Sequence, residues 1–139
     1  MELNSKQLLS TLQKLGNVIS NNPVIPIVSD VILESTGSEL VFRSTNLQQE
    51  ITILINLSYE VGSWVLPYEK LSSLLKMSGD CPIELIFGDN TVTAKMEGKK
   101  FKFATEDAND FPKVRTHATT ETIEFDSYEF KEAITIALA

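Results

Sequence analysis

The chain has 139 residues, of which 42% are hydrophobic and 22% charged, as in a soluble globular protein with a core of its own. No apolar run approaches the ~18 residues of a membrane-spanning helix, and the N-terminus lacks a signal-peptide core, so we expect a cytoplasmic protein with no membrane partner. The single Cys81 and single His117 exclude a His/Cys zinc site, and no phosphate-binding loop is present, so we expect no metal, cofactor or catalytic residue.

The first predicted elements are a short strand and a helix. The helix is expected over about residues 5–20, with Asn4 or Ser5 as its N-cap. Its apolar residues fall within one narrow arc at helical spacing: Leu8, Leu12, Leu15 and Ile19. One buried stripe of this kind predicts a helix that packs against a sheet or another helix.

Three strands, a short strand, a short helix and three more strands are expected to follow. Apolar residues alternate with polar ones from residue 31 to 57 and again from 83 to 103, and Gly-containing turns separate the runs. In the first of these strands Val31 and Leu33 are expected on one face, with Ile32 and Glu34 on the other. The helix is expected over residues 68–77, between Pro67 and Gly79. The order predicts an α+β fold in which two helices pack on one face of antiparallel sheets.

The C-terminal segment resembles the N-terminus at an offset of 122 residues. Glu2, Leu3, Asn4 and Ser5 align with Glu124, Phe125, Asp126 and Ser127, and Leu8 and Leu12 align with Phe130 and Ile134. We therefore expect one domain over residues 1–120 and the first strand and helix of a second, similar domain over residues 121–139. A C-terminal helix that docks on the first domain is the alternative.

The formal net charge of −7 argues against a nucleic-acid partner unless the charges are segregated. They are: the two predicted helices hold four of the 12 basic residues and one of the 19 acidic residues. On the first helix Lys6, Ser10, Lys14 and Asn17 lie opposite the leucines, and such groups suit phosphate oxygens without reading bases. The alternative is a solvated helix face that happens to lack acids.

Four ordered motifs resemble those of the bacterial DNA polymerase III beta subunit, the sliding-clamp family. Residues 21–27 (Asn-Asn-Pro-Val-Ile-Pro-Ile) resemble its loop and Leu-Pro-Ile-Leu strand start, and residues 44–50 its T-D-L-E turn. Residues 65–71 resemble the V-P-A-x-K-F start of its second helix, and residues 108–112 its x-D-F-P signature. The set keeps the family's order and spacing along the whole chain, including the restart near residue 122.

The resemblance implies a DNA-clamp-like fold and a ring of two subunits, each of three similar domains. The ring encircles double-stranded DNA without sequence preference and tethers the replicative polymerase, and a clamp loader is a further partner; the chain itself has no catalytic role. The DNA-facing set that it implies is Lys6, Ser10, Lys14, Asn17, Asn22, Lys70, Ser73 and Lys76. Asn22 stands where several family members have arginine, and Asn46 and Gln48 replace the usual acids of the T-D-L-E turn.

The resemblance also implies that the last strand of the domain, residues 99–104, pairs with the third domain of a second subunit. The implied interface residues are Leu74, Lys100, Phe101, Lys102 and Phe103. An unpaired strand with alternating phenylalanines tends to associate unless it is covered. The lysines could instead protect this edge in a monomer.

Two other functions compete with the clamp. An enzyme would use the carboxylates of Asp107 and Asp110 or Asp89, and would need a conspicuous pocket lined by two of them. A small protein-interaction module would bind a partner by edge-strand pairing at residues 99–104 and ignore DNA.

Overall fold

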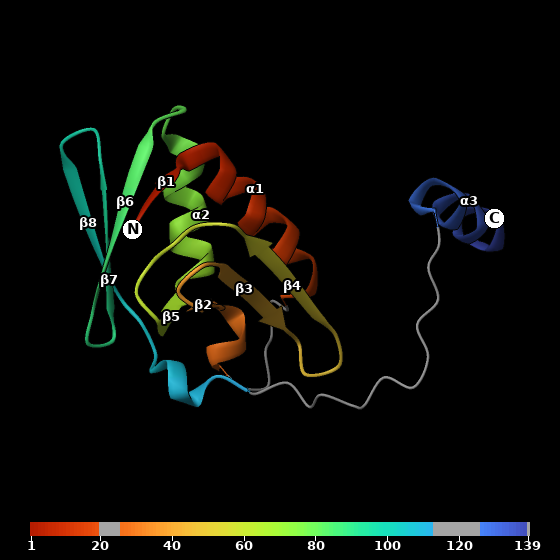
Figure 1. Cartoon of the computed structure of the whole chain (residues 1–139), viewed down its shortest axis with the longest axis horizontal. Helices are drawn as coiled ribbons and strands as arrows, with labels where there is room; N and C mark the ends of the chain where they lie inside the picture. The colour runs from red at the N-terminus through yellow and green to blue at the C-terminus, as the bar shows by residue number, and fades with distance from the viewer. Residues whose placement is uncertain (20–25, 113–125, 139) are drawn as a thin grey trace.

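The computed structural model describes residues 1–19, 26–112 and 126–138 (Figure 1). The predicted order of strands and helices is confirmed. The elements are β1 (Glu2–Asn4), α1 (Ser5–Leu15), β2 (Val31–Ser35), β3 (Leu40–Thr45), β4 (Glu50–Ile55), β5 (Gly62–Leu66), α2 (Tyr68–Met77), β6 (Pro82–Gly88), β7 (Thr91–Met96), β8 (Lys99–Ala104) and α3 (Ser127–Leu138). Short 3₁₀ turns span Gly16–Val18, Pro26–Ser29 and Ala108–Asp110. Within the described ranges, no helix is long and apolar enough to cross a membrane.

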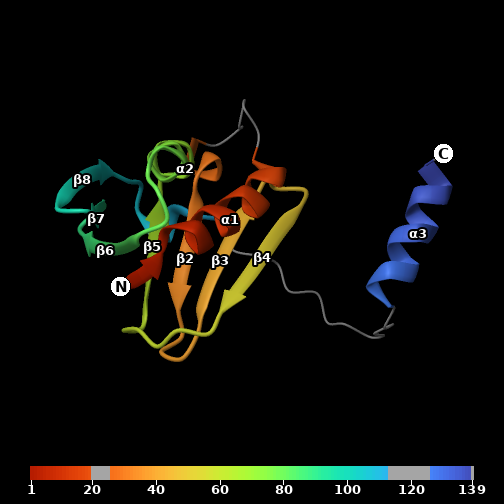
Figure 2. The ribbon, with the colours of Figure 1, turned by 90° about the horizontal axis from the view of Figure 1, so that it is seen from above.

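The strands form two four-stranded sheets, here called sheet A and sheet B. Sheet A has the order β1-β6-β7-β8, and sheet B has the order β4-β3-β2-β5 (Figures 1 and 2). Every pairing recorded among the described residues is antiparallel. Strands β8 and β4 therefore end their sheets with one side unpaired within the part of the chain that the structure describes.

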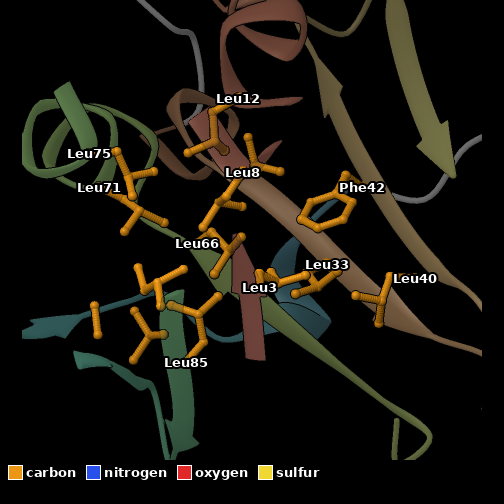
Figure 3. Close-up of a cluster of buried hydrophobic side chains, with 14 of the residues drawn as sticks. Leu3, Leu8, Leu12, Leu33, Leu40, Phe42, Leu66, Leu71, Leu75 and Leu85 are labelled. Carbon is orange, nitrogen blue, oxygen red and sulfur yellow. The ribbon is translucent and has the colours of Figure 1, made fainter. Parts of the chain in front are cut away.

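Helices α1 and α2 pack side by side on one face of the two sheets (Figure 2). Figure 3 shows leucines of both helices meeting residues of both sheets in one cluster. Its helical members are Leu8, Leu12, Leu15, Leu71 and Leu75, each at most 2% exposed. A buried leucine contributes about 1.5–3 kcal/mol, so these five side chains are enough to fix both helices on the sheets.

The ends of the helices follow from local chemistry. The side chain of Asn4 accepts hydrogen bonds from the N–H groups of Lys6 and Gln7, so the predicted N-cap is confirmed. Helix α2 has the predicted bounds. The predicted end of the first helix is wrong, because α1 stops at Leu15, continues as a 3₁₀ turn and is extended at Ile19. Gly16 and Asn17 are weak helix formers, which accounts for the earlier end.

A second apolar cluster covers the other face of sheet B, which the sequence pattern did not predict. Ile32 was expected on the face opposite Val31 and Leu33, and it is buried there rather than exposed. It lies directly across from Val65 in the β2–β5 pairing. Phe111 closes this cluster at 4% exposure, so the phenylalanine of the D-F-P signature has a structural role.

Helix α3 begins at Ser127 and has no buried residue among those described. The predicted domain boundary at residue 120, the strand expected around Phe125, His117 and Asn22 all lie outside the described residues.

Candidate nucleic-acid interface

The exposed side of α1 carries the residues expected to face DNA. Lys6, Ser10 and Lys14 are exposed on the helix, and Asn17 is exposed in the 3₁₀ turn that follows it. They are spaced by three or four residues, whereas the buried leucines lie on the opposite side. This face offers ammonium, hydroxyl and amide donors and no carboxylate.

The exposed side of α2 is similar. Lys70, Ser73 and Lys76 are exposed, Glu69 is the acid of this helix, and Met77 is 87% exposed at its end. Leu74, expected at a subunit interface, is half-buried and packs against the main core. The hydroxyl of Ser72 is buried and has no hydrogen-bond partner among the residues that the structure describes.

Because α1 and α2 are neighbours on one core, their exposed sides form one surface, here called the helical face. It consists of Lys6, Ser10, Lys14, Asn17, Lys70, Ser73 and Lys76. The helices meet closely at Gly16, where an added Cβ would lie 2.1 Å from the hydroxyl oxygen of Tyr68. Cationic and neutral donors on one surface suit the phosphates of a duplex better than its base edges.

Asp30 is a residue of this region that the sequence interpretation missed. Its carboxylate accepts a hydrogen bond from the N–H of Tyr68 at 3.2 Å, at the start of α2. Burial raises the pKa of Asp30 above its usual value; the Tyr68 hydrogen bond lowers this pKa, Glu106 adds to the rise and Lys70 opposes it. The sequence held one indication that α2 needs a cap from another segment, because Pro67 at its start has no side-chain oxygen that could accept a hydrogen bond.

The expected interface strand is at an edge, as predicted. Strand β8 pairs with β7, and Phe101 and Phe103 lie opposite Ala94 and Val92 on the face of sheet A that covers the core. Both phenylalanines are half-buried, and Phe103 packs on the core cluster. Lys100 and Lys102 are exposed on the outward side of the strand.

An acidic depression of about 610 Å³ lies where the β6–β7 turn meets the segment after β8. Its lining includes Asp89 and Asp107, two of the three carboxylates that the enzyme hypothesis singled out, but not Asp110. Both are exposed, and Asp107 caps the 3₁₀ turn by accepting from the N–H of Asn109 at 2.9 Å. Across the described ranges, no group of three His, Cys, Asp or Glu residues is placed to hold a metal ion. Two of the carboxylates therefore do line one pocket, as the enzyme hypothesis requires, but Asp89 is an exposed turn residue and Asp107 an exposed cap, which is ordinary turn and capping chemistry.

The turn at residues 45–49 explains one departure from the family motif. The side-chain oxygen of Asn46 accepts from the N–H groups of Gln48 and Gln49 at 2.9 and 2.6 Å. Leu47 between them has a positive φ of 76°. An aspartate would offer the same acceptor, so Asn46 preserves the turn while removing one negative charge. Nothing in the structure explains Gln48.

Comparison with known proteins agrees with this architecture. Residues 1–115 match the family described as the DNA polymerase III beta subunit, N-terminal domain. The chain is 27% identical over 113 residues to the beta sliding clamp of Haemophilus influenzae, an alignment covering 79% of this chain and 31% of that protein. It is 29% identical over 110 residues to the beta sliding clamp of Pseudomonas putida, covering 77% and 30% respectively.

The fold is also that of a solved relative. The DNA polymerase III subunit beta of Pseudomonas aeruginosa superposes with a TM-score of 0.89 at 24% identity, covering 97% of this chain and 37% of that one. The chain spans about a third of the length of the Haemophilus influenzae and Pseudomonas putida relatives. From the match over residues 1–115, the chain belongs to the family of the DNA polymerase III beta subunit N-terminal domain.

Proposed function

We propose that this chain is the N-terminal domain of a ring-shaped sliding clamp that encircles duplex DNA and tethers a replicative polymerase. The observation that carries the proposal is the family match over residues 1–115, with relatives named beta sliding clamp. The chain serves as a processivity factor and contributes no catalytic group. It acts in the cytoplasm with the polymerase and a clamp loader.

The distribution of charge supports this function. The helical face carries Lys6, Lys14, Lys70 and Lys76, whereas the chain as a whole has a net charge of −7. A basic lining attracts phosphates weakly and without sequence preference, and the acidic remainder repels DNA from other approaches. Retention on DNA then comes from the closed ring, so the contacts remain weak enough for sliding.

A repeat of the domain is supported by the start of α3. Asp126 caps this helix by accepting from the N–H groups of Tyr128 and Glu129. At an offset of 122 residues, Asn4 caps α1 through Lys6 and Gln7 in the same pattern. We therefore assign residues 1–120 to the first domain and residues 121–139 to the beginning of a second, similar one.

Ring closure is assigned to β8, with Leu74, Lys100, Phe101, Lys102 and Phe103 at the contact with a second subunit. Its support is the edge position of β8, with backbone groups free to extend the sheet within the described residues. A head-to-tail contact of this kind closes into a ring when the rotations from one domain to the next add up to a full turn.

The deciding experiment compares retention of the complete protein on circular and linear duplex DNA. After loading on a nicked circle, the protein should stay bound through gel filtration and should be lost when the circle is cut once. Light scattering should give a dimer of subunits of about 366 residues, three repeats of the 122-residue offset. Equal loss from circular and linear DNA would contradict a topological clamp.

The exposed edge of β8 also favours a second candidate, an interaction module that binds a partner by strand addition. This candidate predicts a native monomer of 139 residues that binds an extended peptide at β8 and shows no retention on circular DNA.

A further inference from the structure

Helix α2 begins without a capping side chain of its own. Its N-cap is Pro67, which forms no side-chain capping hydrogen bond. The acceptor for the N–H of Tyr68 is the carboxylate of Asp30, 38 positions away in the sequence, at 3.2 Å. Capping interactions of this type hold the first turn of a helix in place.

Asp30 is held in position by sheet B. The residue after it, Val31, pairs with Leu66 at the end of the β2–β5 ladder, and both of these residues are fully buried. Because the two strands are antiparallel, Asp30, which precedes Val31, lies beside Pro67, which follows Leu66. The ladder therefore brings the carboxylate of Asp30 to the start of α2. The N–H of Asp30 donates to the carbonyl of Ile27, which ties it to the preceding turn. The acceptor is therefore built on a rigid element.

The first turn of α2 carries two residues that matter for the helical face. Tyr68 rests against Gly16 at the end of α1, and Lys70 is exposed two residues later. Asp30 and Lys70 also line one hollow of about 480 Å³, with Tyr68 and Glu69. A shift of this turn would change the position of Lys70 relative to the lysines of α1.

We propose that Asp30 is a positioning residue for the DNA-facing surface, which holds the first turn of α2, and with it Lys70, in place beside α1. The inference rests on the proposed function, because it assigns Asp30 a role through Lys70. The neutral acceptor of asparagine preserves the hydrogen bond to Tyr68 N–H and removes the charge that faces Lys70. Asp30→Asn and Asp30→Ala therefore separate the capping role from simple charge attraction.

The test measures binding of the complete protein to short linear duplex DNA by fluorescence anisotropy over a range of salt concentrations. The variants are Asp30→Ala, Asp30→Asn, Lys70→Gln and the double variant Asp30→Ala/Lys70→Gln. Val92→Ala, which removes buried contacts in sheet A, is the control for lost stability alone. Amide hydrogen exchange at Tyr68 reports on the cap itself.

Lys70→Gln should reduce the slope of log K against log salt by about 0.9, which is about eightfold weaker binding near 0.1 M salt. Asp30→Ala should speed hydrogen exchange at the Tyr68 amide and should reduce the salt slope toward that of Lys70→Gln. The double variant should bind DNA no more weakly than Lys70→Gln alone. Asp30→Asn and Val92→Ala should retain the parent slope.

The positioning role would be overturned if the two substitutions weakened DNA binding additively in the double variant, or if Asp30→Ala left the salt slope unchanged. Either result would leave the proposal that the helical face binds DNA unaffected. Asp30→Asn behaving like Asp30→Ala would overturn it too, because charge and not the acceptor would then matter. If Lys14→Gln, Lys70→Gln and Lys76→Gln all left DNA binding unchanged, the proposed lining itself would fail. Faster exchange at Tyr68 in Asp30→Ala would then still show that the cap exists.

Discussion

Gly16 at the end of α1 lies directly under the ring of Tyr68 at the start of α2. A Cβ at position 16 would come within 2.1 Å of the Tyr68 hydroxyl oxygen and 2.7 Å of the adjacent ring carbon. The closeness of the two helices therefore depends on the absence of a side chain at this position. Since both helices contribute to the helical face, this contact also sets the geometry of that face.

Gly16→Ala should lower the free energy of unfolding by about 1–3 kcal/mol, because Tyr68 must move from its place between the helices. Urea denaturation of the 139-residue chain measures this change. Gly79→Ala is the matched control, since a Cβ at position 79 meets no atom within 4 Å. Equal stability of the Gly16→Ala chain and its parent would contradict the close contact.

Two buried serines should respond in opposite ways to alanine substitution. The hydroxyl of Ser44 donates to the carbonyl of Leu15 at 2.7 Å at the end of α1, whereas the hydroxyl of Ser72 has no partner within the described part of the chain. Ser44→Ala removes this buried hydrogen bond and should cost about 0.5–1.5 kcal/mol. Ser72→Ala removes an unsatisfied hydroxyl and should leave stability unchanged or raise it. The midpoints of urea unfolding of the two variants test these expectations. A larger loss of stability for Ser72→Ala than for Ser44→Ala would contradict them.

The sequence predicted the elements that local chemistry determines. Pro67 and the spacing of Leu71 and Leu75 gave the bounds of α2, and the side chain of Asn4 gave the start of α1. Alternation gave the strands, and in the first of the alternating strands it placed Val31 and Leu33 together on one face, where both are fully buried. These signals depend on residues within a few positions of one another.

What the sequence did not predict depends on contacts between distant segments. Alternation in β2 placed Ile32 on the outer face, but it cannot indicate that Phe111 covers that face from 79 positions away. Likewise, Asp30 caps α2 only because the β2–β5 ladder brings it there. The exposed residues of α1 were predicted from helical spacing alone, and those of α2 were expected from the family resemblance. The contacts that support both helices needed the fold.

The ionisation of Asp30 should make a measurable contribution to the pH dependence of stability. Burial raises the pKa of Asp30 in the folded chain above the ordinary value of 3.8, so the folded state binds this proton more tightly than the unfolded state. Its contribution to stability is then present at low pH and declines as pH rises from about 3.8 through the raised pKa. Glu106 and Lys70 act on this carboxyl in opposite directions, and burial is the larger cause.

Asp30→Asn removes this ionisation and keeps an acceptor for Tyr68. The stability of the variant relative to the parent should therefore increase as pH rises from about 4 to about 7. Urea unfolding of both chains at several pH values gives the difference directly, because the other carboxyl groups are common to both. A difference that is constant or decreases with pH would contradict the raised pKa.

The lysines of the helical face should account for much of the weak attraction to DNA. Lys14→Gln combined with Lys76→Gln in the complete protein should reduce the slope of log K against log salt by about 1.8, because each neutralised phosphate contributes about 0.9. Binding to short linear duplex, where topology does not retain the ring, is the measurement. Lys95→Gln on the outward side of β7 is the control and should leave the slope unchanged. An equal effect of Lys95→Gln would mean that attraction depends on net charge and not on the helical face.

The edge position of β8 gives a test of ring closure. Phe101 is half-buried and, unlike Phe103, is not part of the core cluster, so part of its ring remains available to a partner. Phe101→Asp should place a charge in the proposed subunit contact and convert the complete protein from dimer to monomer in light scattering.

Ile86→Asp is the matched control, since Ile86 is 39% exposed on β6, a strand that is paired on both sides in sheet A. It carries the same apolar-to-charge change away from the edge and should leave the dimer intact. If Phe101→Asp also remained a dimer, the subunit contact would lie elsewhere than β8. If both variants dissociated, the loss would reflect a general weakening of sheet A and not the loss of an edge-strand contact.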